Sequence, residues 1–262
     1  MLLLHALGQP THARAWLLAH DDDALAPDAA ERMRVLAARR MAGEPMAYLT
    51  GEKHFHGLRL TIDARVLDPR DDTETLVDWA LDLLPLEAPR RVLDLGTGSG
   101  AIALAIAQRR PQARVTATDA SADALAVARA NGQRLGLPVD WRHGDWFAPV
   151  AGQSFDLIVS NPPYIAEGDA HLPALAHEPR SALVSGADGL DDLRSIVAAA
   201  GAHLRPGCCW STAGTRRRPC ARCWPRRTLP MCARNAIWQE SSVARAGAGR
   251  TEGSDCARPR RR

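Results

Sequence analysis

The strongest constraint on the fold is a regular alternation of short apolar runs with longer amphipathic stretches between residues 90 and 204. The apolar runs have the length of strands, and the longer stretches carry apolar side chains at helical spacing. The expected strands are 91–95, 114–118, 139–142 and 155–160, and the expected helices are 101–109, 122–135 and 190–204. This alternation predicts an α/β protein with a mostly parallel, doubly wound, Rossmann-like sheet, whose ligands lie at the carboxyl ends of the strands.

The 262 residues divide into four segments. Residues 1–53 are expected to form a small helical domain, because Pro27 stands where a helix would start and apolar residues follow it at helical spacing. Residues 54–89 are expected to form a hairpin and a linker, with a helix near 73–84. Residues 90–207 carry the strand–helix alternation. Residues 208–262 show no clear periodicity and are expected to be disordered.

Charge and cysteine are unevenly distributed along the chain. Residues 208–262 contain 13 Arg, three acidic residues and all six cysteines, whereas residues 1–207 contain 20 Lys and Arg against 27 Asp and Glu. A basic tail is typical of nucleic-acid binding, and the spacing Cys220-x-x-Cys223 is found in metal and redox sites. No apolar run approaches the ~20 residues of a bilayer-spanning helix, and the apolar start is too short for a signal peptide. A cytoplasmic protein without membrane contact is therefore expected.

A glycine-rich segment, Asp94-Leu95-Gly96-Thr97-Gly98-Ser99-Gly100, joins the first expected strand to its helix. Glycines here let the backbone turn sharply and approach a ligand closely, and the free N–H groups of the helix N-terminus favour an anionic group. Asp119 ends the next strand, where a carboxylate commonly accepts hydrogen bonds from ribose hydroxyls. The pattern predicts a nucleotide-like ligand. It leaves open NAD, whose relaxed fingerprint also fits, and glycines that serve only a tight turn.

Two further features favour S-adenosyl-L-methionine over NAD. Asp94 precedes the glycines by two residues, where its carboxylate can meet the cationic sulfonium end of that cofactor or its amino group. Asp145, Trp146 and Phe147 follow the third expected strand and offer a carboxylate and aromatic rings near the place of an adenine. Ordinary packing of Trp146 and a solvated turn at Asp145 are the alternatives.

The most specific motif is Asn161-Pro162-Pro163-Tyr164, directly after the apolar run 155–160. Because proline fixes φ and has no N–H, the Asn161 side-chain oxygen and the Pro162 carbonyl form a rigid pair of acceptors. Such a pair can hold both N–H groups of a target –NH₂ and aim its nitrogen at a methyl carbon, with Tyr164 beside the planar acceptor. Orientation of this kind can lower a barrier by ~7–11 kcal/mol. No strong general base is needed, because the proton can leave after methyl transfer. A proline-rich loop without further function is the alternative.

The glycine segment, Asp119 and residues 161–164 together resemble the class I methyltransferases that act on planar nitrogens. The flanking sequences are similar to those of the release factor glutamine methyltransferases (the HemK/PrmC family). These flanks are residues 44–51, 55–57, 69–74, 177–183 and 186–190, and the likeness covers residues 1–207. Members of that family usually carry a further helix before the position of Met1, so the helical domain is expected to be clipped at its start.

The resemblance implies a reaction and a set of site residues. The family transfers a methyl group from S-adenosyl-L-methionine to the side-chain amide nitrogen (N5) of the glutamine in the Gly-Gly-Gln loop of peptide chain release factors, which its helical annex docks. The implied cofactor contacts are Gly96, Thr97, Gly98, Ser99, Gly100, Asp119, Trp146 and Asn161. The implied glutamine contacts are Asn161, Pro162, Pro163 and Tyr164, of which Asn161, Pro162 and Tyr164 are the implied catalytic residues. No metal, direct nucleic-acid contact or membrane contact is implied.

Two other reactions share the chemistry of residues 161–164: adenine-N6 methylation and methylation of another protein glutamine, such as one in a ribosomal protein. A nucleic-acid enzyme should carry a target-recognition region and a basic face, whereas residues 1–207 are net acidic. If the chain were a non-catalytic or NAD-binding Rossmann protein, residues 161–164 would have no function.

The last segment is interpreted as the product of a reading-frame shift near Gly207. Reading each codon from its third base turns Cys208-Cys209 into Leu-Leu, and permitted codon choices give family-like strand and helix sequences further on. On this hypothesis the cysteines are not a metal site and the arginines are not a nucleic-acid surface. The sheet is also expected to lose its last two strands, which leaves an exposed edge.

Overall fold

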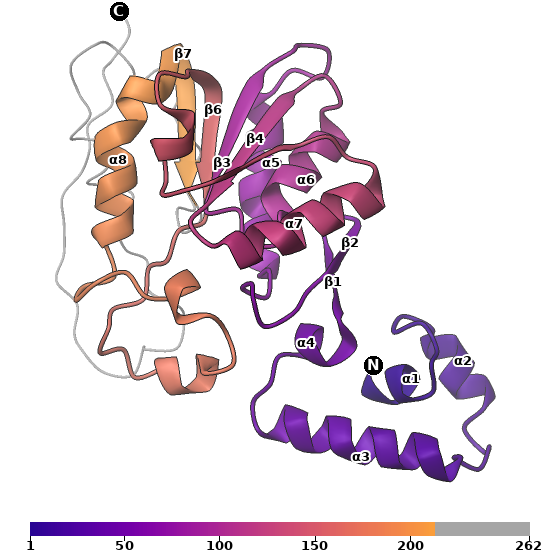
Figure 1. The fold of residues 1–262 in the computed structure, drawn as a ribbon. Helices are drawn as coiled ribbons and strands as arrows, with labels where there is room; N and C mark the ends of the chain where they lie inside the picture. Colours follow the sequence, from indigo (N-terminus) through magenta and orange to yellow (C-terminus); the bar gives the residue numbers. More distant parts are fainter. Residues whose placement is uncertain (213–262) are drawn as a thin grey trace, which may run out of the picture.

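Residues 1–212 of the chain are described by the computed structural model, which Figure 1 shows as a small helical unit joined to a larger α/β unit. The expectations for residues 213–262, including the Cys220-x-x-Cys223 spacing and the predicted disorder, lie outside the described residues. None of the helices within residues 1–212 is long and apolar enough to cross a bilayer.

The N-terminal unit contains four helices, α1 Leu2–Ala6, α2 Arg14–Ala19, α3 Pro27–Met41 and α4 Met46–Thr50. Pro27 occupies the first turn of α3, where its fixed φ suits the helix and its missing N–H costs nothing. Ala6, Leu36 and Leu49 come from three of these helices and form a small core of their own. The helix that the spacing predicted from Pro27 corresponds to α3, whereas α1 and α4 had not been predicted as separate helices.

The connection between the two units is a hairpin followed by a helix. β1 Glu52–Phe55 and β2 Leu58–Thr61 pair in antiparallel register. The sequence predicted a hairpin over 54–68, but the ladder runs from Glu52 to Thr61, and Ile62 and Val66 lie beyond it in the main core. Helix α5 Glu74–Leu83 follows and packs against α6 Ala101–Arg109.

Within residues 1–212 the central sheet has five parallel strands in the order β5-β4-β3-β6-β7. The strands are β3 Arg91–Leu95, β4 Arg114–Asp119, β5 Asp140–His143, β6 Phe155–Ser160 and β7 Leu204–Thr212. Helices α5, α6 and α7 Ala122–Leu135 cover one face, and α8 Asp191–His203 covers the other (Figure 1). Val92 packs in the first of these layers, whereas Leu93 and Leu95 pack with Ile196 of α8 in the second. The predicted doubly wound α/β fold is confirmed.

The order of the strands reverses beside β3. The chain runs outward from β3 to β4 and β5 and then returns to β6 on the other side of β3. At this switch point the Ser160 hydroxyl donates to the Leu95 carbonyl oxygen over 2.8 Å and joins the carboxyl ends of the two strands. A ligand crevice is expected at such a point, because the connections leave the two strands toward opposite faces.

The prediction that β6 would end the sheet is wrong for the described residues. Strand β7 continues past Gly207 and pairs in parallel with β6 along Leu157–Ser160, so it covers that edge. Backbone pairing joins N–H and C=O groups and does not require particular side chains. The helix expected over 190–204 correspondingly ends at His203, one residue before β7 begins.

Candidate active site

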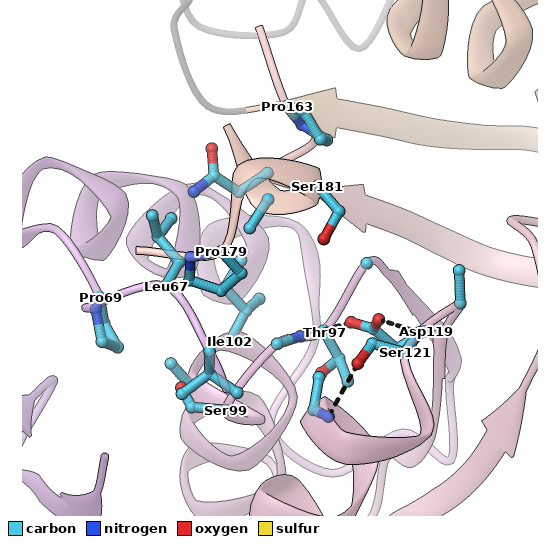
Figure 2. Close-up of a pocket in the computed structure, with 18 of the residues that line it drawn as sticks. Leu67, Pro69, Thr97, Ser99, Ile102, Asp119, Ser121, Pro163, Pro179 and Ser181 are labelled. Atoms are coloured by element: carbon cyan, nitrogen blue, oxygen red, sulfur yellow. Dashed lines mark hydrogen bonds between the residues drawn. The ribbon is translucent and has the colours of Figure 1, made fainter. Parts of the chain in front are cut away.

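A cavity of about 380 Å³ opens at the carboxyl ends of β3, β4 and β6. It is lined by the glycine segment, by Asp119 and by two segments that are distant in sequence, around residues 67–69 and 179–182. Figure 2 shows Leu67 and Pro179 next to one another, across the cavity from Thr97, Asp119 and Ser121. The site is therefore built by the sheet, the linker and the loop before α8 together.

The glycine segment turns as the sequence predicted. Gly96, Gly98 and Gly100 all have positive φ, at 67°, 57° and 82°. A Cβ on Gly100 would lie 2.9 Å from the Trp141 ring, and one on Gly96 would lie 3.3 Å from the Trp146 ring. Glycine is required at 100 both for its conformation and for close packing. Gly96, Thr97, Gly98 and Ser99 line the cavity, whereas Gly100 begins α6 behind it.

Asp119 lies at the end of β4 with its carboxylate on the cavity. The Gly98 N–H donates to one carboxylate oxygen over 2.8 Å, and the Ser121 N–H donates to the other over 2.9 Å. Burial raises the pKa of Asp119, and the N–H groups of Ser121 and Gly98 partly offset that rise. Each oxygen keeps a free lone pair, so the carboxylate can accept from two neighbouring hydroxyls of a ribose.

Asp94 differs from the expectation for it. Its side chain is fully buried, and the cavity is lined by other residues. One carboxylate oxygen accepts the Thr97 hydroxyl over 2.6 Å, and the other has no hydrogen-bond partner among residues 1–212. Burial raises the pKa of Asp94 to about 7. Its carboxyl group therefore contacts the glycine segment at Thr97 and does not reach the cavity.

Trp146 and Asp145 both line the cavity, and Trp146 lies against Gly96. Trp146 has φ of 39°, and its carbonyl oxygen accepts the Thr118 hydroxyl over 3.1 Å, which fixes this turn to β4. Phe147 points elsewhere, because it is buried in the core under α8 and stacks on His203 with ring centroids 4.6 Å apart. Of the two aromatic rings expected near an adenine, only Trp146 lines the cavity.

The segment 161–164 separates this cavity from a second one of about 310 Å³. Asn161 lines both cavities, Pro163 lines the first, and Pro162 and Tyr164 line the second. The Leu183 carbonyl oxygen accepts from the N–H groups of Tyr164 and Ile165, at 3.2 and 2.9 Å, and holds the segment in place. Among residues 1–212 the Asn161 side chain has no hydrogen-bond partner. Its amide is thus available to a ligand.

Sequence reasoning missed the walls that come from outside the motifs. Arg65, Leu67, Pro69, Pro179 and Ser181 all line the first cavity, and only their likeness to family flanks had singled out the last three. Their places depend on pairing between segments far apart, which no local pattern reports.

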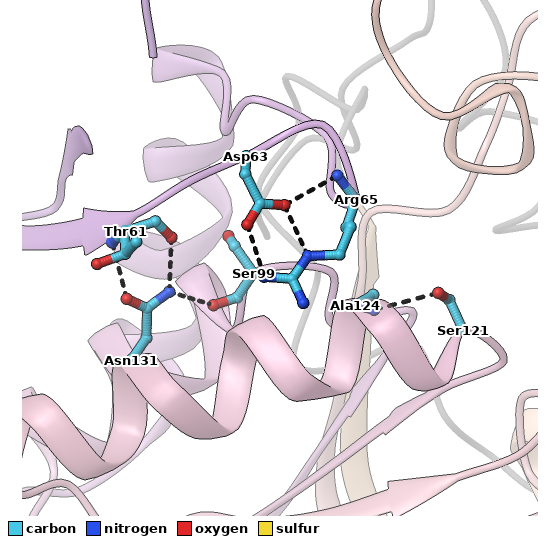
Figure 3. Close-up of polar contacts among 7 residues, drawn as sticks. All are labelled: Thr61, Asp63, Arg65, Ser99, Ser121, Ala124 and Asn131. Carbon is cyan, nitrogen blue, oxygen red and sulfur yellow. Dashed lines mark hydrogen bonds and ion pairs between the residues drawn. The ribbon is translucent and has the colours of Figure 1, made fainter. Parts of the chain in front are cut away.

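Asn131 of α7 was also missed, although it joins the linker to the glycine segment (Figure 3). This side chain is fully buried. Its oxygen accepts from the Thr61 N–H over 2.7 Å, and its amide donates to the carbonyl oxygens of Thr61 at 3.0 Å and Ser99 at 3.1 Å. The linker that leaves β2 is thereby fixed beside the glycine segment.

The site suits a ligand with a diol and an aromatic base. It offers a paired acceptor at Asp119, an indole face at Trp146 and glycine backbone without Cβ atoms, in a volume typical of cofactor sites. No group of three or more His, Cys, Asp or Glu side chains within the described residues could hold a metal ion.

Comparison with known proteins agrees with this geometry. Residues 1–51 match the family described as PrmC N-terminal domain, and residues 73–188 match the Methyltransferase small domain. The fold and site thus define an S-adenosyl-L-methionine-dependent methyltransferase with a Rossmann-like α/β domain.

Similarity to whole proteins is more specific. The release factor glutamine methyltransferase of Bordetella pertussis is 52% identical over 210 residues, which cover 79% of this chain and 77% of that protein. The protein of the same name from Xylella fastidiosa is 54% identical over 209 residues, covering 79% and 75%. That from Yersinia pestis is 48% identical over 198 residues, covering 74% and 71%. The chain belongs to the release factor glutamine methyltransferase family.

Solved structures with a related fold include other methyltransferases. A 16S rRNA N2-G1207 methyltransferase of T. thermophilus, in complex with AdoMet and guanosine, aligns with a TM-score of 0.46 at 25% identity and covers 62% of this chain and 40% of that one. A SAM-dependent methyltransferase from Agrobacterium tumefaciens aligns with a TM-score of 0.45 at 20% identity and covers 63% and 53%.

Proposed function

We propose that the chain methylates the side-chain amide nitrogen (N5) of the glutamine in the Gly-Gly-Gln loop of peptide chain release factors, with S-adenosyl-L-methionine as donor. The observation that carries the proposal is the position of Asn161, whose amide has no partner within residues 1–212 and lines both cavities where they meet. A target nitrogen held there reaches from the second cavity toward the first. The names of the relatives support the choice of release factors as the substrate.

The cofactor site in this proposal is the first cavity. Gly96, Thr97, Gly98 and Ser99 present backbone to the cofactor, and Gly100 allows α6 to begin directly behind them. Asp119 accepts the ribose hydroxyls, and Trp146 and Asn161 bound the rest of the site. Bound S-adenosyl-L-methionine supplies a methyl group on a positively charged sulfur, which makes that carbon electrophilic.

In this proposal the chain promotes methyl transfer by orienting the glutamine amide and not by general acid–base catalysis. The Asn161 side-chain oxygen and the Pro162 carbonyl accept the two N–H groups of the glutamine amide, because Pro162 has no N–H of its own to compete. These two bonds fix the plane of the amide and direct its nitrogen lone pair, and such orientation can be worth ~7–11 kcal/mol. Pro163 keeps the segment rigid, and Tyr164 walls the second cavity. The surplus proton leaves to solvent after transfer.

The domains have separate tasks in this proposal. Residues 1–53 dock the release factor, residues 54–89 connect, and residues 90–207 bind the cofactor and carry the reaction. The net acidic character of residues 1–207 favours a protein substrate over a nucleic acid. Since release factors act on ribosomes, the proposed place of action is the cytoplasm, without membrane contact.

The test is transfer of a tritiated methyl group from S-adenosyl-L-methionine to purified, unmethylated release factor. The chain should be compared with a version in which the reading frame is restored after Gly207 and with the restored Asn161→Ala variant. Label on the Gly-Gly-Gln glutamine that disappears in the Asn161→Ala variant supports the proposal. Label on DNA adenine or on a ribosomal protein, with none on release factor in either frame, contradicts it.

A further inference from the structure

The loop before α8 connects the helical unit to both cavities. His177 Nε2 lies 3.0 Å from the Ala42 carbonyl oxygen at the end of α3. A few residues on, Pro179, Ser181 and Ala182 line the first cavity, within and beside the short helix η4 Arg180–Ala182. The helical unit also reaches the linker directly, because the Tyr48 hydroxyl of α4 donates to the Val66 carbonyl oxygen over 2.5 Å.

Glu178 is the buried carboxylate of this loop. Only 2% of its side chain is exposed. One carboxylate oxygen accepts from the backbone N–H of Asp68 over 3.1 Å, and the other accepts from the Arg70 guanidinium over 2.5 Å. These partners are 110 and 108 residues away in sequence. A single side chain thus joins the linker to the loop before α8.

The residues next to these contacts form the wall between the two cavities. Leu67, which precedes Asp68, and Ala182, four residues after Glu178, both line the two cavities, as Asn161 does. Arg70 lines the second cavity and Pro179 the first. In Figure 2 Leu67 and Pro179 lie side by side. The Glu178 contacts therefore fix how closely the two wall segments approach one another around Asn161.

We propose that Glu178 is a positioning residue for methyl transfer: it holds the wall formed by Leu67 and Ala182, and this wall keeps the target nitrogen aligned at Asn161. The expected effect on catalysis rests on the proposed function. The contacts of Glu178 with Asp68 and Arg70 do not, because they exist in the protein alone. The glycine segment and Asp119 make no hydrogen bond with Glu178 within the described residues, so most cofactor contacts do not depend on Glu178.

The test is Glu178→Gln, which keeps the shape of the side chain but replaces one of its two acceptor oxygens by an amide donor, so that only one of the two donors keeps a partner. Since a misplacement of about 1 Å can cost on the order of 100-fold in rate, we expect kcat with release factor to fall about 10- to 100-fold. The Kd for S-adenosyl-L-methionine, measured by calorimetry, should change far less. Hydrogen exchange at the Asp68 amide should become faster, because the charged Arg70 guanidinium is the stronger donor and keeps the remaining oxygen, which leaves the Asp68 N–H facing the new amide.

Asp156→Asn is the matched control. Asp156 is also a buried carboxylate that accepts one backbone N–H, that of Arg91 over 2.7 Å, and pairs with arginines. It stands near the start of β6, five residues before Asn161, and about 16 Å away along an extended strand. This variant should lose stability but keep wild-type kcat and wild-type exchange in residues 66–70.

The outcomes are distinct. Equal losses of kcat in the two variants, wild-type kcat in Glu178→Gln, or unchanged exchange at Asp68 would each overturn the proposal. If Glu178→Gln does not fold, Arg70→Met tests the same wall from the linker side, and wild-type kcat in that variant counts against it. If the wild-type chain transfers no methyl group to release factor, the proposed function fails, while hydrogen exchange still decides whether Glu178 holds the wall.

Discussion

Replacing Asp94 by Asn should make the free energy of unfolding less dependent on pH. Asp94 is fully buried at the end of β3, with a single side-chain donor, the Thr97 hydroxyl, and one unpaired oxygen among the described residues. Burial raises its pKa from 3.8 to about 7, against the opposing effects of the Thr97 hydroxyl and the Ala103 N–H. The folded protein consequently holds a proton that the unfolded chain releases.

The sign and size follow from this difference in pKa. Between pH 4 and 7 the native state binds more protons than the unfolded state, so the contribution of Asp94 to stability is lost as the pH rises through that range. Each pKa unit corresponds to about 1.4 kcal/mol, so stability due to this group should fall by roughly 3 kcal/mol between pH 5 and pH 8. The amide of the Asp94→Asn variant does not titrate and should show none of this fall.

The assay is urea unfolding of the ligand-free protein and of Asp94→Asn at several values of pH between 5 and 8.5. The variant should be the less stable protein at pH 5, because its amide leaves a buried donor unpaired at a cost of about 1–3 kcal/mol. It should gain about 3 kcal/mol relative to the wild type by pH 8. An exposed control, Asp82→Asn on α5, should give a constant difference. A constant difference for Asp94→Asn as well would refute the reasoning.

Three other substitutions test separate parts of the structure. Asn131→Ala removes the hydrogen bonds to Thr61 and Ser99 and should lower the free energy of unfolding by about 2–4 kcal/mol. A loss below 1 kcal/mol in denaturant titration would show that this amide does not hold the linker to the glycine segment. Gly100→Ala places a Cβ 2.9 Å from a tryptophan ring at a residue with positive φ, and it should lower the free energy of unfolding by about 2–4 kcal/mol. The loss should clearly exceed that of Gly136→Ala, whose Cβ would meet nothing within 4 Å. Equal shifts in Tm for the two variants would argue against a clash with the tryptophan. Asp119→Asn should weaken binding of S-adenosyl-L-methionine about 10- to 100-fold, because hydrogen bonds to a charged acceptor are worth about 1.5–3 kcal/mol. Wild-type affinity in calorimetry would show that Asp119 does not bind the cofactor.

The acidic and aromatic residues around the motifs show where sequence reasoning stopped. Trp146 and Phe147 are neighbours in sequence, yet Trp146 lines the cavity and Phe147 stacks on His203 under α8. The left-handed backbone at Trp146 divides the pair, and no composition signal marks it in advance. Asp119 ends β4 and Asp94 is the last residue but one of β3, yet of the two only Asp119 reaches the cavity. Burial separates their roles, and burial is a property of the assembled layers.

Local patterns in the sequence determined the elements and the motifs. The bounds of β3, α6, α7 and β6 agree with the predicted ranges, because apolar periodicity and glycine or proline punctuation act within a few residues. The turn at Gly96–Gly100 and the segment after β6 follow from backbone preferences that belong to glycine and proline themselves.

The tertiary structure alone decided how the site is closed. Glu178 meets Asp68 and Arg70 across more than 100 residues, and Asn131 meets Thr61 across 70. Strand β7 covers the edge of β6 although its residues 208–212 had been assigned to an unstructured tail. Such contacts form only when the layers bring buried polar groups together, because most buried donors and acceptors then pair with whatever partner the chain provides.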